Sequence, residues 1–372
     1  MRKKYIVGFP VLGNYYIPIY NFLNNIVDKE LVEVLMPNKI TDETIVNGAK
    51  VSPDFVCVPF KYNMGNYIEA IEKGANVLIQ AGGGCRYGYY FELQEQILKD
   101  MGNDFIFISF LEEEGLNIKK LYNKLKILNP NLRFSEFCYQ GGLAVSTVKI
   151  MDDFETYMRN NYNLQINENE FDKIEEEMLN DILKINTLSK LVNFKNKYVK
   201  KLKQVNLRKI NNDDIKIGIV GELFTSMEPF SSFFIEKELL NYKCIVKRYT
   251  TVTYLILQKG FAKKKVMKKA SGYIDYHFGA DGPETIAHTL ELIDKNYDGI
   301  IHIKPFGCSP EINAMPILQK ISREKNIPIM YLTFDEQTTS TGIKTRIEAF
   351  YDMLKMKKDQ NYANIKEEKV YE

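Results

Sequence analysis

The sequence predicts an α/β protein in which two flavodoxin-like lobes, each a doubly wound parallel sheet, are joined by a helical segment. Short, almost continuously apolar runs alternate with helical patterns in both halves of the chain, as in parallel sheets covered on both faces. Strand signals disappear between these halves. We therefore expect a first lobe over residues 1–133, a helical connection over 134–213 and a second lobe over 214–372.

In the first lobe, apolar runs predict four strands, over residues 5–11, 31–36, 76–81 and 104–110. Apolar residues at helical spacing predict helices over 15–27, 64–73, 89–101 and 117–128. Thr41 is expected to cap a further helix, with Thr44 at the position where a capping box usually has Glu.

The connecting segment has a helical pattern. Residues 168–177 are acid-rich and residues 190–209 are base-rich, which is typical of solvated helix faces. Its apolar residues recur at helical spacing: Phe171, Ile174, Met178, Ile182 and Ile185.

The second lobe begins with a strand and tight turn over residues 215–222, followed by predicted strands over 244–249, 299–304 and 327–334. Helices are predicted over 230–240, 284–294, 310–325 and 341–356. The charged terminal stretch 357–372 is expected to fray.

A repeated pattern links the two lobes. Residues 66–85 and 289–308 align without a gap, and both consist of a helix, a short turn, an apolar strand, glycine and cysteine. Few side chains match, so the repeat is one of pattern. It places Cys85 and Cys308 at equivalent strand ends.

Composition excludes several classes of protein. The 372 residues include 50 basic and 48 acidic side chains, a balance that argues against nucleic-acid or membrane-surface binding. No apolar run is long enough to span a membrane, and the apolar run near the start is too short for a signal peptide. We therefore expect a cytoplasmic protein, in which five cysteines do not indicate a disulfide framework.

Three cysteines lie where open α/β sheets bind ligands, beyond the carboxyl ends of strands. Cys57, Cys85 and Cys308 each precede an expected helix N-terminus, where the helix dipole and unpaired N–H groups favour thiolate. Glycine and proline flank them. The alternative is that each is a small buried apolar residue, and without a CxxC motif the residues alone leave both interpretations open.

The remaining cysteines and motifs indicate less. Cys244 lies within a strand pattern and is expected in the core. For Cys138 we favour packing. The alternative is that it is a fourth ligand, or a neighbour, of a metal site formed by the three cysteines above. A P-loop, a GxSxG motif and a GxGxxG motif after the first strand of either lobe are absent, and the three histidines lack metal-ligand spacing. Hydrolytic catalysis and P-loop chemistry are therefore disfavoured.

Four segments resemble the 2-hydroxyacyl-CoA dehydratase and benzoyl-CoA reductase superfamily, and within it the acyl-CoA dehydratase activase-related proteins. They are SPDFVCVPFK, GANVLIQAGGGCRYG, IIHIKPFGCSPEINAMPIL and IPIMYLTFDEQTTSTGIKTRIEAFYDML. The resemblance covers about residues 5–110 and 215–354, and it is most specific over 304–354. The glycine triple before Cys85 departs from the proline-rich loops common in the dehydratases.

The resemblance implies a single 4Fe-4S cluster between the lobes, held by Cys57, Cys85 and Cys308. One iron would then lack a protein thiolate. An ATP-dependent activase or another electron donor and a CoA thioester are the implied partners, and a dimer is allowed. Lys61 and Lys304 are candidates to balance the cluster's charge, although exposed lysines are expected there. Asp335 and Arg346 are candidates for a structural ion pair.

Three functions remain open at this point. The first is oxygen-sensitive, low-potential dehydration or reduction of a CoA thioester, the second is non-catalytic electron transfer or cluster carriage, and the third is a metal-free binding protein. The sequence leaves undecided whether the chain is an enzyme.

Overall fold

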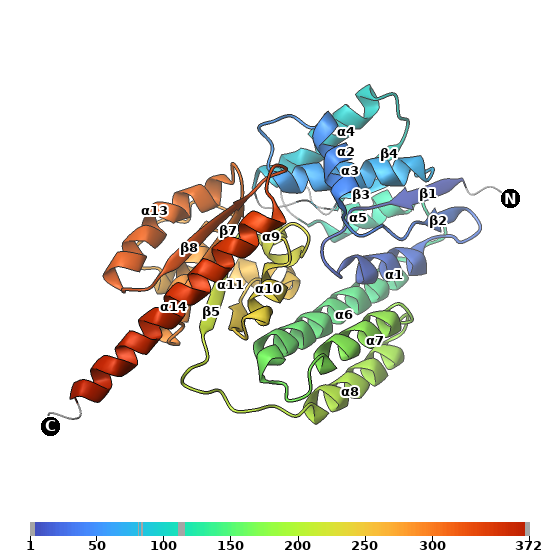
Figure 1. Ribbon diagram of the computed structural model, residues 1–372. Coiled ribbons are helices and arrows are strands. Elements are labelled where there is room, and N and C mark those ends of the chain that lie inside the picture. The colour runs from blue at the N-terminus through green and yellow to red at the C-terminus, as the bar shows by residue number, and fades with distance from the viewer. Residues whose placement is uncertain (1–3, 81, 83–84, 111–115, 369–372) are drawn as a thin grey trace. The chain divides into compact units, whose positions relative to one another are not determined.

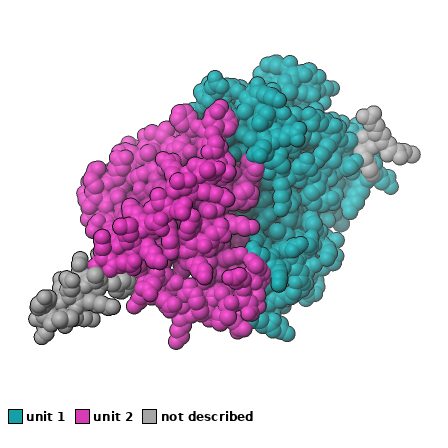
Figure 2. Space-filling model, in the orientation of Figure 1, with its two compact units in different colours: residues 1–152, 172–204 teal, residues 153–171, 205–372 magenta. Residues whose placement is uncertain are grey.

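The computed structural model describes residues 4–80, 82, 85–110 and 116–368, and side chains as far as residue 360. The expectations made for Gly83, Gly84 and the last four residues lie outside this range. The chain forms two compact units, coloured separately in Figure 2. Unit 1 contains residues 1–152 and 172–204, and unit 2 contains residues 153–171 and 205–372.

Unit 1 is built on a four-stranded parallel sheet of order β2-β1-β3-β4 (Figure 1). Its central strand β1 pairs with β2 on one side and β3 on the other. The strands are β1 (Tyr5–Gly8), β2 (Val32–Val34), β3 (Val77–Gln80) and β4 (Ile106–Ser109). Its first helices are α1 (Tyr16–Ile26), α2 (Asp42–Val51), α3 (Val58–Glu72), α4 (Tyr90–Asp100) and α5 (Ile118–Leu125).

Helices cover both faces of this sheet. Leu23 of α1 and Leu125 of α5 belong to the apolar cluster on one face, and Tyr67 of α3 and Leu98 of α4 belong to the cluster on the other. The inner strand β3 is buried at all four positions, whereas the edge strand β2 exposes Glu33.

The helical segment expected after the first lobe consists of α6 (Phe134–Asn161), a 3₁₀ turn at Tyr162–Leu164, α7 (Glu170–Ile182) and α8 (Leu188–Gln204). Acidic side chains of α7 pair with basic side chains of α8: Lys197 lies 2.6 Å from Asp181, and Lys201 pairs with Glu177. The segment contributes residues to both units.

Unit 2 repeats the topology of unit 1, with a parallel sheet of order β6-β5-β7-β8. Its strands are β5 (Lys216–Gly221), β6 (Ile245–Arg248), β7 (Gly299–Pro305) and β8 (Ile329–Phe334). Its helices are α9 (Leu223–Met227), α10 (Ile235–Asn241), a π-helix at Tyr254–Gln258, α11 (Lys259–Lys269), α12 (Gly282–Asp294), α13 (Ser309–Glu324) and α14 (Ser340–Glu368).

The same layering recurs in unit 2. Leu239 of α10 and Ile347 of α14 pack on one face of the sheet, and Ile286 of α12 and Leu318 of α13 belong to the cluster on the other side. The predicted fold class, two flavodoxin-like lobes with parallel sheets, is confirmed.

Several element boundaries differ from the predictions. Helix α3 begins at Val58, because Pro59 fits the first turn of a helix that Cys57 caps. Helix α9 has only five residues, and α11 is rich in lysine, so neither gives a clear apolar stripe. The backbone of α14 is helical to Glu368, so the expected helix end at Met356 was wrong; no proline or glycine follows Met356 to end the helix. Fraying of this terminal stretch stays a prediction.

Two glycines allow α2 and α3 to pack closely. A Cβ atom on Gly48 would lie 1.8 Å from the carbonyl oxygen of Lys61, and one on Gly65 would lie 2.0 Å from that of Thr44. Close packing therefore fixes α3, whose N-terminus carries Cys57.

The expected capping box of Thr41 and Thr44 is present at the start of α2.

Candidate functional site

The shared topology places Cys85 and Cys308 at corresponding positions. In each sheet the first strand lies between the second and the third, so the chain reverses direction across the sheet where β1 meets β3 and β5 meets β7. Open α/β sheets bind ligands at such switch points, beyond the carboxyl ends of the strands. Cys85 follows β3 and Cys308 follows β7, as the sequence repeat predicted.

All three predicted site cysteines occupy N-cap positions. Cys57 caps α3, Cys85 caps the 3₁₀ helix Arg86–Tyr89, and Cys308 caps α13. Cys85 is exposed, while Cys57 and Cys308 are partly buried. The expectation that each thiol precedes a helix N-terminus is confirmed, and the N–H groups of these first turns lie where an anionic sulfur is favoured.

Within unit 1, two tyrosines connect the environments of Cys57 and Cys85. The Cys57 sulfur lies 3.4 Å from the Tyr90 hydroxyl oxygen, and the backbone N–H of Tyr87 donates to the Cys85 sulfur at 3.4 Å. The two tyrosine rings lie 5.5 Å apart between centroids, and the Asn63 side chain of α3 donates to the Tyr87 hydroxyl. Cys57 therefore contacts Tyr90, and Cys85 contacts the backbone of Tyr87, whose ring packs beside that of Tyr90. Cys308 belongs to unit 2.

Tyr90 is suited to donate a hydrogen bond to Cys57. Burial raises the pKa of Tyr90 well above its usual range, and the neighbouring Cys57 adds to this shift. The phenol therefore stays protonated at neutral pH, and its O–H can stabilise negative charge on the sulfur.

The two candidate lysines are buried, so the expectation that they are exposed was wrong. Lys61 lies on α3 and Lys304 on β7, with 3% and 5% of their surfaces exposed. Burial lowers the pKa of Lys304, and Cys308 and Glu311 oppose this shift by favouring the charged form. Lys304 therefore interacts electrostatically with Cys308 and Glu311. Both lysines are buried because neighbouring strands and helices pack over them.

A buried polar network lies in the first turn of α13. His302 Nε2 is 2.7 Å from Glu311 Oε2, and Thr285 Oγ1 donates to Glu311 Oε1 at 3.0 Å. His302 and Glu311 are fully buried. This network joins β7, α12 and α13, and its Glu311 lies three residues after Cys308 in the sequence.

The other two cysteines differ in burial. Cys244 is fully buried, and burial raises its thiol pKa to about 12, which confirms the expected core position. Cys138 is exposed on α6, so the favoured interpretation, packing in the core, was wrong. It lies next to Phe137, which takes the buried position on that turn.

The expected ion pair of Asp335 and Arg346 is not formed between these two described residues. Asp335 Oδ1 accepts hydrogen bonds from Gln337 N and Thr338 Oγ1, and Arg346 is exposed. The carboxylate closes its own turn after β8 instead.

Unit 2 also contains a polar cluster that no sequence motif indicated. Glu222, directly after β5, accepts hydrogen bonds from the backbone N–H groups of Phe224 and Thr225, and burial raises its pKa to about 7. The remaining members of the cluster are Tyr254, Lys259, His277, Asp281 and Glu284. The signal that could have found them is weak: an acid after a glycine-ended strand, and Pro-Glu at a helix start.

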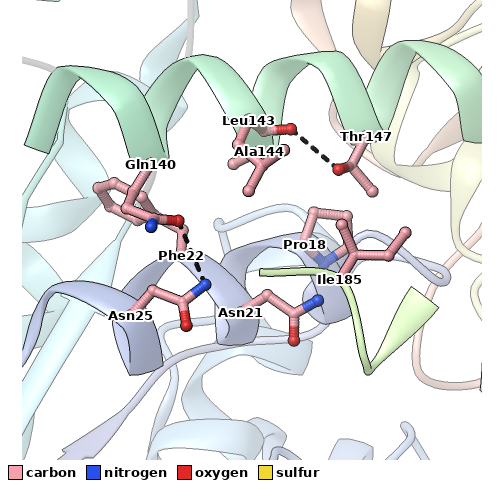
Figure 3. Close-up of a pocket in the computed structure, with 9 residues that line it drawn as sticks. All are labelled: Pro18, Asn21, Phe22, Asn25, Gln140, Leu143, Ala144, Thr147 and Ile185. Atoms are coloured by element: carbon pink, nitrogen blue, oxygen red, sulfur yellow. Dashed lines mark hydrogen bonds between the residues drawn. The ribbon is translucent and has the colours of Figure 1, made fainter. Parts of the chain in front are cut away.

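A polar pocket lies between α1 and α6 in unit 1 (Figure 3). Asn25 donates to Gln140 at 3.2 Å, and Asn21 donates to the backbone oxygen of Ile182 at 2.8 Å. No charged or thiol side chain is among the residues that line it.

Thiols are the ligands that iron–sulfur clusters take, so the donor chemistry of Cys57, Cys85 and Cys308 fits such a group. Over the described part of the chain, no group of three or more His, Cys, Asp or Glu side chains is assembled to hold a single metal ion. None of the helices in that part combines the length and apolar character needed to cross a membrane.

The fold and the site define a class: α/β proteins of two flavodoxin-like units that present cysteines beyond the carboxyl ends of their sheets. A family model described as 2-hydroxyglutaryl-CoA dehydratase, D-component, matches residues 145–354. The chain belongs to this family, and the resemblance to the 2-hydroxyacyl-CoA dehydratase superfamily is confirmed. The match includes Cys308 and begins after Cys57 and Cys85. Comparison with curated proteins gave no match.

Proposed function

We propose that the chain is an iron–sulfur component of 2-hydroxyacyl-CoA dehydratase type that binds one 4Fe-4S cluster through Cys57, Cys85 and Cys308. The observation that carries the proposal is the N-cap position of all three thiols, two of which, Cys85 and Cys308, follow equivalent strands of the two sheets. Membership of the dehydratase family supports it independently.

The neighbouring side chains suit a negatively charged cluster. Tyr90 can donate to the Cys57 sulfur, and the backbone of Tyr87 donates to the Cys85 sulfur. The Lys304 ammonium favours negative charge near Cys308. Hydrogen bonds to the sulfurs and nearby charge are among the factors that set a cluster's potential.

When bound through three thiolates, the cluster would supply low-potential redox chemistry and one iron open to a substrate oxygen. We propose that the substrate is a CoA thioester that is dehydrated or reduced. We propose that electrons come from an ATP-dependent activase or another donor. This activity would be oxygen-sensitive and cytoplasmic.

Non-catalytic electron transfer is the second candidate. The exposure of Cys85 favours it, because electron transfer needs a cluster close to a docking face. A catalytic protein must also bind the thioester.

The test is purification without oxygen, followed by iron and sulfide analysis and turnover assays. We expect about four iron and four sulfide per chain, and dehydration of 2-hydroxyacyl-CoA when an activase and ATP are added. Iron without turnover would favour the electron-transfer candidate. Absence of iron after anaerobic reconstitution would exclude both and leave a metal-free binding protein.

A further inference from the structure

Glu284 of unit 2 is a buried carboxyl group with an unused oxygen. It lies in the first turn of α12 and has 4% of its surface exposed. Tyr254 donates to Oε1 at 3.4 Å, while Oε2 accepts no hydrogen bond from any residue that the structure describes. His277 Nε2 lies 3.8 Å from that oxygen, which is beyond hydrogen-bond distance.

Burial favours the uncharged forms of both Glu284 and His277. Burial raises the pKa of Glu284; Lys259 opposes this shift and Asp281 adds to it. Lys259 and Asp281 pair with each other at 2.5 Å. Burial lowers the pKa of His277, and Lys263 and Lys259 lower it further. A buried carboxyl oxygen that receives no hydrogen bond from the described part of the protein is left for a donor on a ligand.

The backbone around Glu284 is irregular. Tyr254 belongs to a π-helix, and Ala280, just before α12, has φ 40°. Both features are uncommon and are concentrated at functional sites. They hold Tyr254 and His277 against the first turn of α12.

Glu284 also lies close to the site proposed above. A Cβ atom on Gly282 would lie 2.8 Å from the carbonyl oxygen of Pro310, so the first turns of α12 and α13 are in contact. Thr285, next to Glu284, donates to Glu311. Helix α13 is the one that Cys308 caps.

We propose that Glu284, Tyr254 and His277 form a subsite for the hydroxyl group of a 2-hydroxyacyl thioester. Glu284 Oε2 accepts from the ligand hydroxyl, and Tyr254 donates to Oε1. His277 Nδ1 accepts from the N–H of Gly279, so Nε2–H is left to donate to the ligand oxygen. The inference rests on the proposed function only for the class of ligand, since all three side chains belong to unit 2.

The experiment measures binding of 2-hydroxyglutaryl-CoA and glutaryl-CoA to the full chain by calorimetry without oxygen. The parent protein should bind the hydroxylated thioester about tenfold more tightly, because a site that pairs with a hydroxyl group disfavours the ligand lacking it. Glu284→Leu should abolish the preference, and Glu284→Gln, which keeps one acceptor oxygen, should retain part of it. Glu291→Gln is the matched control, because Glu291 lies on the same helix and bonds to Lys295 instead.

A second readout is the imidazole NMR spectrum of the three histidines, in which the hydroxylated ligand should shift His277 and leave the fully buried His302 in place. This readout holds for the parent even where Glu284→Leu fails to fold. Equal affinity of the parent for the two thioesters, no binding of either, or an unshifted His277 would overturn the subsite. A parent without iron that still prefers the hydroxylated thioester would instead refute the cluster and uphold the subsite.

Discussion

The sulfur of Cys57 and the hydroxyl oxygen of Tyr90 lie 3.4 Å apart, and the backbone N–H of Cys57 points to the same oxygen at 3.5 Å. The phenol thus contacts both the thiol and the backbone of the residue that caps α3. Because Tyr90 also packs against the ring of Phe60, its hydroxyl is held in place.

Tyr90→Phe should slow alkylation of Cys57 several-fold at near-neutral pH in the metal-free protein. The substitution keeps the ring and removes a hydrogen bond that stabilises the reactive thiolate. The measurement is the labelling rate of each cysteine by mass spectrometry. The exposed Cys138 should react at an unchanged rate, and an unchanged rate at Cys57 would show that the hydroxyl does not act on the sulfur.

Cys308→Ser should lose most of its iron, because serine is a poor ligand for an iron–sulfur cluster. Its melting temperature should fall as well, since a cluster bound only to the folded form stabilises that form. Iron content is measured without oxygen, side by side with Cys244→Ser and Cys138→Ser. The Cys244 control should keep its iron because that thiol is fully buried, whereas loss from Cys138→Ser would add that thiol to the site. Parent-like iron in Cys308→Ser would remove Cys308 from the ligand set.

Gly65→Ala should destabilise unit 1 by about 2 kcal/mol or more, because its new methyl group would meet the backbone oxygen of Thr44 at 2.0 Å. Gly142→Ala on α6 is the control: a Cβ atom there has no neighbour within 4 Å, so a gain of about 0.5–1 kcal/mol is expected. Urea unfolding of both variants checks the prediction. Equal stabilities would mean that α2 and α3 separate without loss.

Glu311→Ala should cost about 2–4 kcal/mol, because it leaves His302 and Thr285 without their buried partner. Glu311→Gln keeps one acceptor for Thr285 and should cost less. Glu324→Ala, on the exposed end of the same helix, should change the free energy of unfolding by less than about 1 kcal/mol. A loss in Glu311→Ala no larger than in Glu324→Ala would contradict the role of the network.

Stability should fall as the pH rises from about 4.5 through about 7, owing to Glu222. The carboxyl group has its usual pKa of 4.5 in the unfolded chain and about 7 in the folded one, so the unfolded chain releases its proton first and gains population. Glu222→Gln should flatten this part of the stability curve, measured by denaturant unfolding at about pH 5 and about pH 8. Glu291→Gln should leave the slope unchanged, since the folded-state pKa of Glu291 is lowered and its carboxyl group titrates below this pH window.

The sequence determined the fold class and the positions of Cys85 and Cys308 after equivalent strands. Both depend on local signals: buried parallel strands are apolar, and Ser309 and Pro310 mark where the helix after Cys308 begins. The helix after Cys57 begins at Val58, six residues before its predicted start. The repeat of residues 66–85 and 289–308 likewise predicted that β3 and β7 occupy equivalent positions. These patterns depend on residues close together in the sequence, so they can be recognised in one sequence without a structure.

Only the tertiary structure decided which side chains become partners. Lys304 has an ordinary sequence context, yet β7 lies in the middle of a sheet covered on both faces, and the lysine is buried. Glu284, Tyr254 and His277 come from three successive elements whose spacing has no motif, and Glu311 meets Thr285 because two helices cross at their first turns. Apolar periodicity predicts which face of an element is buried, whereas the contacts of a polar group depend on how that face meets another element.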